Sequence, residues 1–182
     1  MAQNIEGRLS VIDGYRLART VGDQLKDRTN YTIEEFIEAA EQAIKKNSDD
    51  WVTLYALGTK YPDIGKYAES IKILGRCVEL RPKDIRSVYA LATSYNLLTR
   101  AAWTKKQADE RNAKFGLTGF TKIDPDLAKE ELDRAGLTLE TAVAQAIRWF
   151  ERALELNPDN QSKAQIQWDL ETLYQRFPKL RH

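Results

Sequence analysis

Between Trp51 and Asp84 the apolar positions follow two helical periods with a break between them. A three-then-four spacing in each half predicts one buried face per helix. The first stripe is Leu54, Leu57, Gly58 and Tyr61, and the second is Tyr67, Ile71, Leu74, Cys77 and Val78. Pro62 and Gly65 supply the break, since proline removes a donor and glycine permits a left-handed turn. We therefore predict two short antiparallel helices, with Gly58 at a close approach that offsets its cost of about 1 kcal/mol in a helix.

These residues resemble the degenerate 34-residue unit of the tetratricopeptide repeat family. The matching positions are Leu54, Leu57, Gly58, Tyr61, Gly65, Tyr67, Leu74, Cys77 and Pro82. The sequence departs from the family at Leu54, where tryptophan is usual, and at Ser70, where alanine is usual. The resemblance implies an all-α fold of stacked helix-turn-helix repeats, and recurrence of the pattern strengthens it.

The pattern recurs, more weakly, before this unit. Helical spacing over residues 5–27 predicts a first helix, and Thr32 with Glu35 forms a capping box for a second. The apolar positions of that second helix, all expected to point inward, are Ile33, Phe36, Ile37, Ala40, Ala43 and Ile44. Residues 1–50 are interpreted as a divergent N-terminal repeat.

After Pro82 the first-helix pattern returns as Val88, Leu91, Ala92 and Tyr95, but the second-helix pattern reappears only at 143–158. Relative to a 34-residue period, about 42 extra residues separate the two halves. We expect one helix from Ile85 to about Lys114, a loop, a short helix from Pro125 closed by Gly136, and a helix capped by Thr138.

The last helix is expected over residues 161–176 as a C-terminal cap, because Trp168 stands where the family has glycine. Residues 179–182 are expected to be a frayed tail. We therefore predict a single domain, residues 1–182. It contains three repeats, at 1–50, 51–84 and 85–160, and the third repeat carries an inserted helical hairpin near 100–140. A capping helix and tail follow at 161–182.

Composition narrows the class of function. The chain has 42% hydrophobic and 30% charged residues and a net charge of +1, which disfavours nucleic acid as a partner. No run approaches the roughly 18 apolar residues of a membrane span. One cysteine cannot form an internal disulfide, and no signal layout opens the chain, so we expect a cytoplasmic protein.

Candidate chemistry is sparse, and we predict that the protein is not an enzyme and holds no cofactor or metal. The only histidine is His182, at the chain end, and Cys77 lies on an apolar stripe where packing is its expected role. Acidic pairs such as Glu130 and Glu131 are interpreted as solvated faces or caps. The alternative is an enzyme site in the insertion that depends on Arg111 or Asp124.

Binding is better supported, because the resemblance implies that first helices line a concave groove for a protein or peptide partner. The groove candidates are Tyr55, Thr59, Arg86, Tyr89, Thr93 and Asn96, continued by Gln165 and Asp169. Tyr55 and Thr59 stand where one subset of the family has a lysine and an asparagine that grip a C-terminal carboxylate, which argues against that role. Arg86 could still bind an acidic group by itself.

The insertion is a second candidate surface, both aromatic and basic. Its candidate residues are Trp103, Arg111, Phe115 and Phe120. These aromatics either pack the hairpin onto the repeats or dock another protein. The function predicted is a protein-protein interaction module, an adaptor or a subunit built into a larger assembly, with a transient, co-chaperone-like assembly factor as the alternative.

Overall fold

The computed structural model describes the backbone of residues 32–115 and 125–180, and the side chains in these ranges except at 104–115, 125 and 126. The described part is helical, without strands, as predicted. Its elements are α2 Ile33–Lys46, α3 Trp51–Lys60, η1 Tyr61–Ile64, α4 Tyr67–Leu80, α5 Ile85–Phe115, α6 Pro125–Ala135, α7 Leu139–Glu155, α8 Asn160–Arg176 and η2 Pro178–Leu180. The helix expected over residues 5–27 and the last two residues of the tail, 181 and 182, lie outside the described residues.

Local signals set the helix ends. Glu35 donates its backbone N–H to Thr32 Oγ1 at 3.2 Å while the Thr32 N–H reaches Glu35 Oε2 at 3.0 Å, which confirms the capping box. Thr138 caps α7 in the same way with Thr141. Gly65 and Gly136 have φ angles of 78° and 66°, the left-handed conformation expected where these glycines end helices.

Gly58 lies at a close approach of α3 to α4, as the sequence predicted. A Cβ at this position would stand 2.6 Å from Leu74 Cγ, so only glycine fits without movement. Ser70 Oγ donates to the Gly58 carbonyl at 2.7 Å and lies 2.7 Å from Ser94 Oγ. The serine at the family's alanine position therefore connects α3, α4 and α5 through hydrogen bonds.

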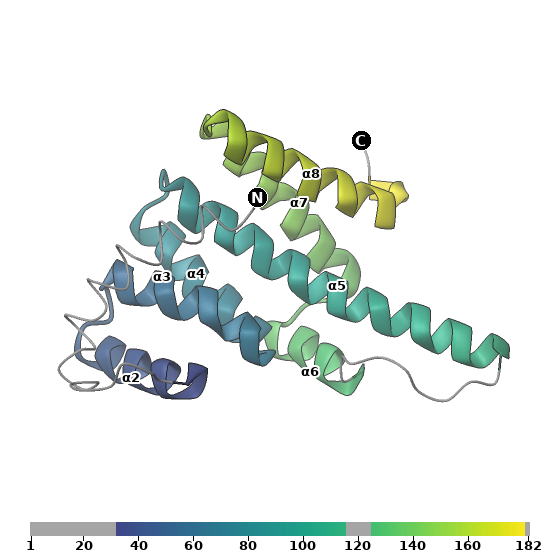
Figure 1. Ribbon diagram of the computed structural model, residues 1–182, viewed down its shortest axis with the longest axis horizontal. Helices are drawn as coiled ribbons and strands as arrows, with labels where there is room; N and C mark the ends of the chain where they lie inside the picture. Colours follow the sequence, from purple (N-terminus) through teal and green to yellow (C-terminus); the bar gives the residue numbers. More distant parts are fainter. Residues whose placement is uncertain (1–31, 116–124, 181–182) are drawn as a thin grey trace.

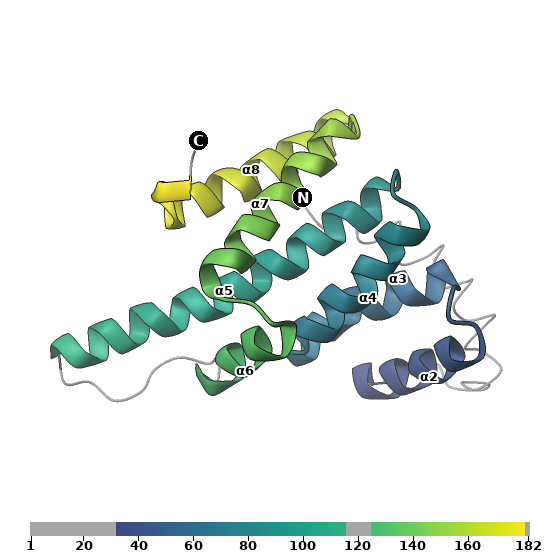
Figure 2. The same cartoon turned by 180° about the vertical axis from the view of Figure 1, so that it is seen from behind.

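The helices form two layers, with α3, α5 and α8 in one and α4 and α7 in the other (Figures 1 and 2). The long helix α5 packs along α7, and α8 packs on α7. The inserted helix α6 lies against α4 and α5. The core between the layers is apolar, and its fully buried side chains include Leu54, Leu74, Val88, Val143 and Phe150.

The sequence expectations for Ile33 and for the start of the tail are wrong. Ile33 is 39% exposed rather than inward, because it opens α2, ahead of the part that packs on α3 and η1. Residues 179 and 180 are not frayed: they belong to η2, and Leu180 packs against the core that Phe177 also contacts. No helix among the described residues is both long and apolar enough to cross a membrane.

Candidate functional site

The candidate site is the side of α3, α5 and α8 that carries the predicted groove residues, called the inner face below. Its described members are Tyr55 and Thr59 on α3, Arg86, Tyr89, Thr93 and Asn96 on α5, and Gln165, Asp169 and Arg176 on α8. These helices belong to one layer (Figure 1). Two hydrogen bonds join α5 directly to α8 on this face.

At the α3 end, aromatic rings hold the charged groups in place. The rings of Trp51 and Tyr55 stack at 5.3 Å with 16° between their planes. The guanidinium groups of Arg81 and Arg86 lie 4.3 Å and 4.7 Å from the centre of the Trp51 ring. Arg86 also pairs with Asp84 at 3.0 Å, so its charge is partly neutralised within the chain.

The expectation that Tyr55 lies off the core is wrong. Its exposure is 9%, because its ring stacks on Trp51, a residue that the stripe analysis did not include. A role for Tyr55 in partner binding stays a prediction. Thr59, one turn further along α3, is partly exposed and donates to its own helix, from Oγ1 to the Ala56 carbonyl at 2.9 Å.

Between α5 and α8 the inner face carries a polar ladder of two rungs. In the first rung, Tyr89 donates its hydroxyl to Asp169 Oδ2 at 2.9 Å, and Gln165 donates to the same oxygen at 3.3 Å. In the second, Arg176 Nη2 donates to Asn96 Oδ1 at 3.0 Å. These bonds fix the positions of Tyr89 and Asn96, two of the residues predicted for partner binding.

The charged groups of the ladder are partly removed from solvent, and this shifts the pKa values of Asp169 and Arg176. Burial raises the pKa of Asp169, while the hydrogen bonds from Tyr89 and Gln165 and the charge of Arg176 oppose that rise. Burial also lowers the pKa of Arg176, and the neighbouring positive charge of Arg100 lowers it further. Arg176 is thus a cation held in an environment that disfavours its charge.

The ladder also contains hydrogen-bonding groups without partners. The hydroxyl oxygen of Thr93 and the Nη1 nitrogen of Arg176 are both shielded from solvent and unbonded. Thr93 was among the predicted groove residues, whereas Arg176 was not. Sequence reasoning placed Arg176 only at the end of the last helix, where a basic residue is typical of a helix C-terminus.

The insertion residues are described only in part. Trp103 packs its ring against Phe177 at a centroid distance of 5.0 Å and an interplanar angle of 64°, which joins α5 to the chain after α8. Trp103 thus makes a packing contact within the chain, and its role in partner binding stays a prediction. The side chains of Arg111 and Phe115, and Phe120 altogether, lie outside the described residues, and their binding role stays a prediction.

A buried carboxylate in α6 was missed by the sequence analysis. Glu131 is 0% exposed, accepts the backbone N–H of Ala68 at 2.7 Å and pairs with Arg134 at 2.8 Å. It therefore caps α4 from a different helix, whereas its neighbour Glu130 is exposed as expected. No local signal could have shown this, because the two partners are 63 residues apart.

Cys77 is buried in the core, and burial raises the pKa of its thiol to about 12, which fits packing rather than reactivity. Among the residues that the structure describes, no group of three acidic, cysteine or histidine side chains is placed to hold a metal ion.

The comparisons with known proteins agree with the helical architecture. A sequence model described as a tetratricopeptide repeat matches residues 53–84, which span α3 and α4. Tetratricopeptide repeat protein 37 of Xenopus laevis is 30% identical over 129 residues, covering 68% of this chain but 8% of that protein. The chain is therefore similar to a small part of a much longer relative.

Proposed function

Because the chain belongs to the tetratricopeptide repeat family, we propose that it is a protein-protein interaction module whose inner face binds an extended segment of a partner. Repeats of this family generally mediate protein-protein interaction, and stacked helix pairs present such a face. Within this function the chain acts as an adaptor or as a subunit built into a larger assembly.

The observation that carries the proposal is the ordered set of polar groups on α5 and α8. Tyr89 and Asn96 are held by partners on the facing helix, so their side chains lose little conformational entropy when a ligand arrives. Such preorganisation increases affinity by lowering the cost of binding. On the insertion, by contrast, Trp103 is already occupied by Phe177.

The proposal is tested by quantitative capture of partners from a native lysate on three variants. The first carries Thr59→Arg with Gln165→Arg, which places two large cations on the inner face. The second carries Lys72→Ala on the exposed side of α4, as a matched surface control. The third replaces residues 107–123 with a short Gly-Ser linker, leaving Trp103 and α6 in place.

Loss of a stoichiometric partner in the first variant alone is the expected result. Loss in the third variant alone would assign binding to the insertion, with Arg111, Phe115 and Phe120 as its candidates. Failure of the intact chain to retain any partner at stoichiometric yield would contradict the proposal. Circular dichroism on each variant checks that the helices are retained.

A further inference from the structure

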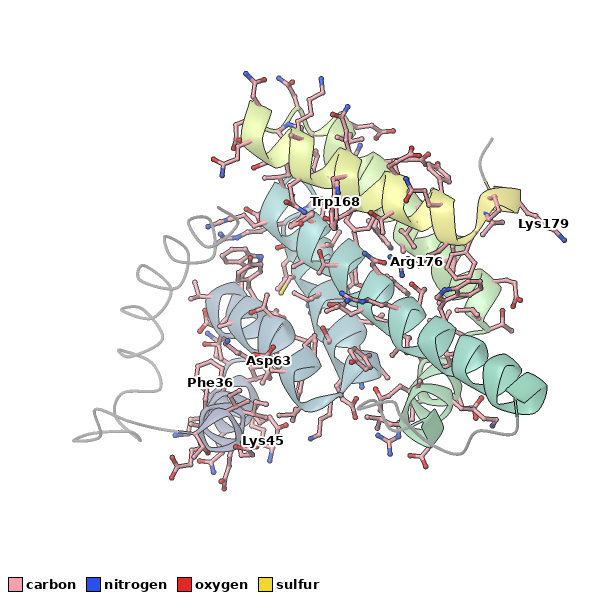
Figure 3. All side chains as sticks on the ribbon, turned by 45° about the vertical axis from the view of Figure 1, so that its right-hand side comes forward. Phe36, Lys45, Asp63, Trp168, Arg176 and Lys179 are labelled. Carbon is pink, nitrogen blue, oxygen red and sulfur yellow. The ribbon has the colours of Figure 1, made fainter. Side chains whose placement is uncertain are left out.

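Trp168 is the most exposed large hydrophobic side chain among the described residues, with 64% of its surface open to solvent. It lies near the middle of α8, and Arg176 lies further along the same helix (Figure 3). In the repeat pattern its position corresponds to Gly58 on α3 and to Ala92 on α5. A large aromatic ring therefore stands in solvent at a position where the two preceding first helices have the smallest residues.

On α3 and α5 the equivalent side of the helix is covered by a second helix. Gly58 meets Leu74 of α4, and Ala92 is fully buried in the core cluster to which α7 contributes. On α8 the same positions of the pattern form a set that we call the open face, made of Ala164, Gln167, Trp168 and Glu171. Ala164 and Gln167 are exposed together with Trp168, so the described part of the chain leaves most of this face uncovered.

The solvent-exposed residues of α8 are depleted of charge. Lys163 is the charged residue among them, and the others are Asn160, Gln161, Ala164, Gln167, Trp168 and Gln175. Lys163 precedes Trp168 by five residues, which places it about 140° away around the helix. The exposed residues of α7, by contrast, include Glu140, Arg148, Glu151, Arg152 and Glu155. An aromatic side chain at the centre of a surface poor in charge is typical of the core of a protein interface.

The open face is complementary to a second copy of itself. Ala164 lies one turn before Trp168 on the same side of α8, so a small residue stands beside a large one. When two such helices pack antiparallel about a two-fold axis, each indole ring lies over Ala164 of the other copy. An uncharged face meets its own copy without like-charge repulsion, and glutamine amides can both donate to and accept from each other. The same lack of charge gives the face little electrostatic selectivity for a different protein.

We propose that the open face of α8 is a self-association surface through which two copies of this chain form an antiparallel pair of α8 helices. The pair is closed at two copies, because both use the same surface. It is weak, since one helix face per copy is smaller than the roughly 800 Å² per partner of a stable complex. The inference goes beyond the proposed function, because it uses the open face rather than the inner-face residues Gln165 and Asp169 of the same helix.

Sedimentation equilibrium of the intact chain, from about 1 μM to about 500 μM, tests the proposal. The chain should be monomeric at the low end and dimeric at the high end, as expected for a dissociation constant of about 10 to 100 μM. Trp168→Ala removes the ring, and Ala164→Glu places a carboxylate under the ring of the other copy. Each should raise the dissociation constant by about ten-fold or more. Ala144→Glu is the matched control, because it makes the same change at an exposed alanine of α7 and should leave the constant unchanged.

A folding control and three contrary outcomes complete the test. Because Trp168 and Ala164 are exposed, both variants should melt within a few degrees of the wild type at 1 μM, where the chain is monomeric. A monomer at every concentration would overturn the proposal. So would a dimer that Ala144→Glu weakens as much as Ala164→Glu does, or assemblies that grow beyond two copies. These outcomes leave the binding role of the inner face untouched, since partner capture measures that role separately.

Discussion

Glu131 joins the insertion to the best-matching repeat through a single carboxylate. It is fully buried, caps α4 through the Ala68 N–H at 2.7 Å, and pairs with Arg134. Glu131→Gln removes the charge from both interactions and should lower the free energy of unfolding by about 1 to 3 kcal/mol. Urea denaturation followed by circular dichroism measures the change.

The neighbouring residue provides the control for this prediction. Glu130 is exposed and lies 3.6 Å from the same arginine, so Glu130→Gln should change stability by less than about 0.5 kcal/mol. Equal effects of the two substitutions would show that general charge, rather than the buried cap, determines the result.

The thiol of Cys77 should react only when the protein unfolds. Its pKa is about 12 instead of 9.0 because of burial, so its thiolate fraction at pH 8 is about a thousand-fold below that of an ordinary thiol. We expect a thiol-specific chromogenic reagent to label the native chain at pH 8 far more slowly than the chain in urea. Rapid labelling of the native chain would contradict the buried position.

The same pKa shift has a consequence for stability at high pH. Above pH 9 the unfolded chain releases the Cys77 proton, whereas the folded chain keeps it until about pH 12. Folding stability is therefore lost as pH rises through this window, by up to about 1.4 kcal/mol per unit. Buried tyrosines add their own slope, so the difference between the wild type and Cys77→Ala in pH-dependent urea unfolding isolates the thiol.

At the scale of elements, the contact of α3 with α4 depends on the absence of a side chain at Gly58. An added Cβ would lie 2.6 Å from Leu74 Cγ, and overpacking of this kind costs about 1 to 3 kcal/mol. Gly75 on α4 has nothing within 4 Å of its would-be Cβ. Gly58→Ala should thus destabilise the protein, while Gly75→Ala should stabilise it by about 0.5 to 1 kcal/mol, as thermal unfolding would show.

Element boundaries were predictable here because their signals are local. The capping boxes at Thr32 and Thr138, the turn glycines and the uninterrupted helix formers of α5 each act within a few residues. The contacts that shape the inner face are not local. Tyr89 and Asp169 are 80 residues apart, as are Asn96 and Arg176, and their pairing depends on how α5 and α8 meet.

The burial of Tyr55 is a second feature that the sequence pattern did not predict. Helical spacing predicts that Tyr55 lies on a different side of α3 from the apolar stripe of Leu54, Leu57 and Gly58, and α3 does have that helical spacing. Its ring is nevertheless covered, because Trp51 lies one turn earlier on α3 and stacks on it. Periodicity predicts which side of a helix a residue occupies, but a large aromatic neighbour can extend the core around that helix.

At the scale of the whole molecule, α6 is part of the fold although it belongs to the insertion. Besides the Glu131 cap, it buries Ala128 to 1% exposure and places Leu127 2.8 Å from the position a Cβ would take at Gly65. The Glu131 cap is made to Ala68 of α4, and the Leu127 approach is to Gly65. Replacing only 107–123 with a short Gly-Ser linker should therefore leave the melting temperature within a few degrees of the wild type, since loop length changes stability slowly.

The wider replacement of residues 102–136 removes the Trp103 contact with Phe177 together with all of α6. It also leaves the Ala68 N–H, at the start of α4, without the carboxylate that caps it. We expect a loss of several kcal/mol and a broadened transition in calorimetry. If both replacements melt alike, α6 adds nothing to the repeats. If only the wider one is destabilised, the insertion consists of a docked helix and a separable segment, and the narrower variant is the one to use in binding experiments.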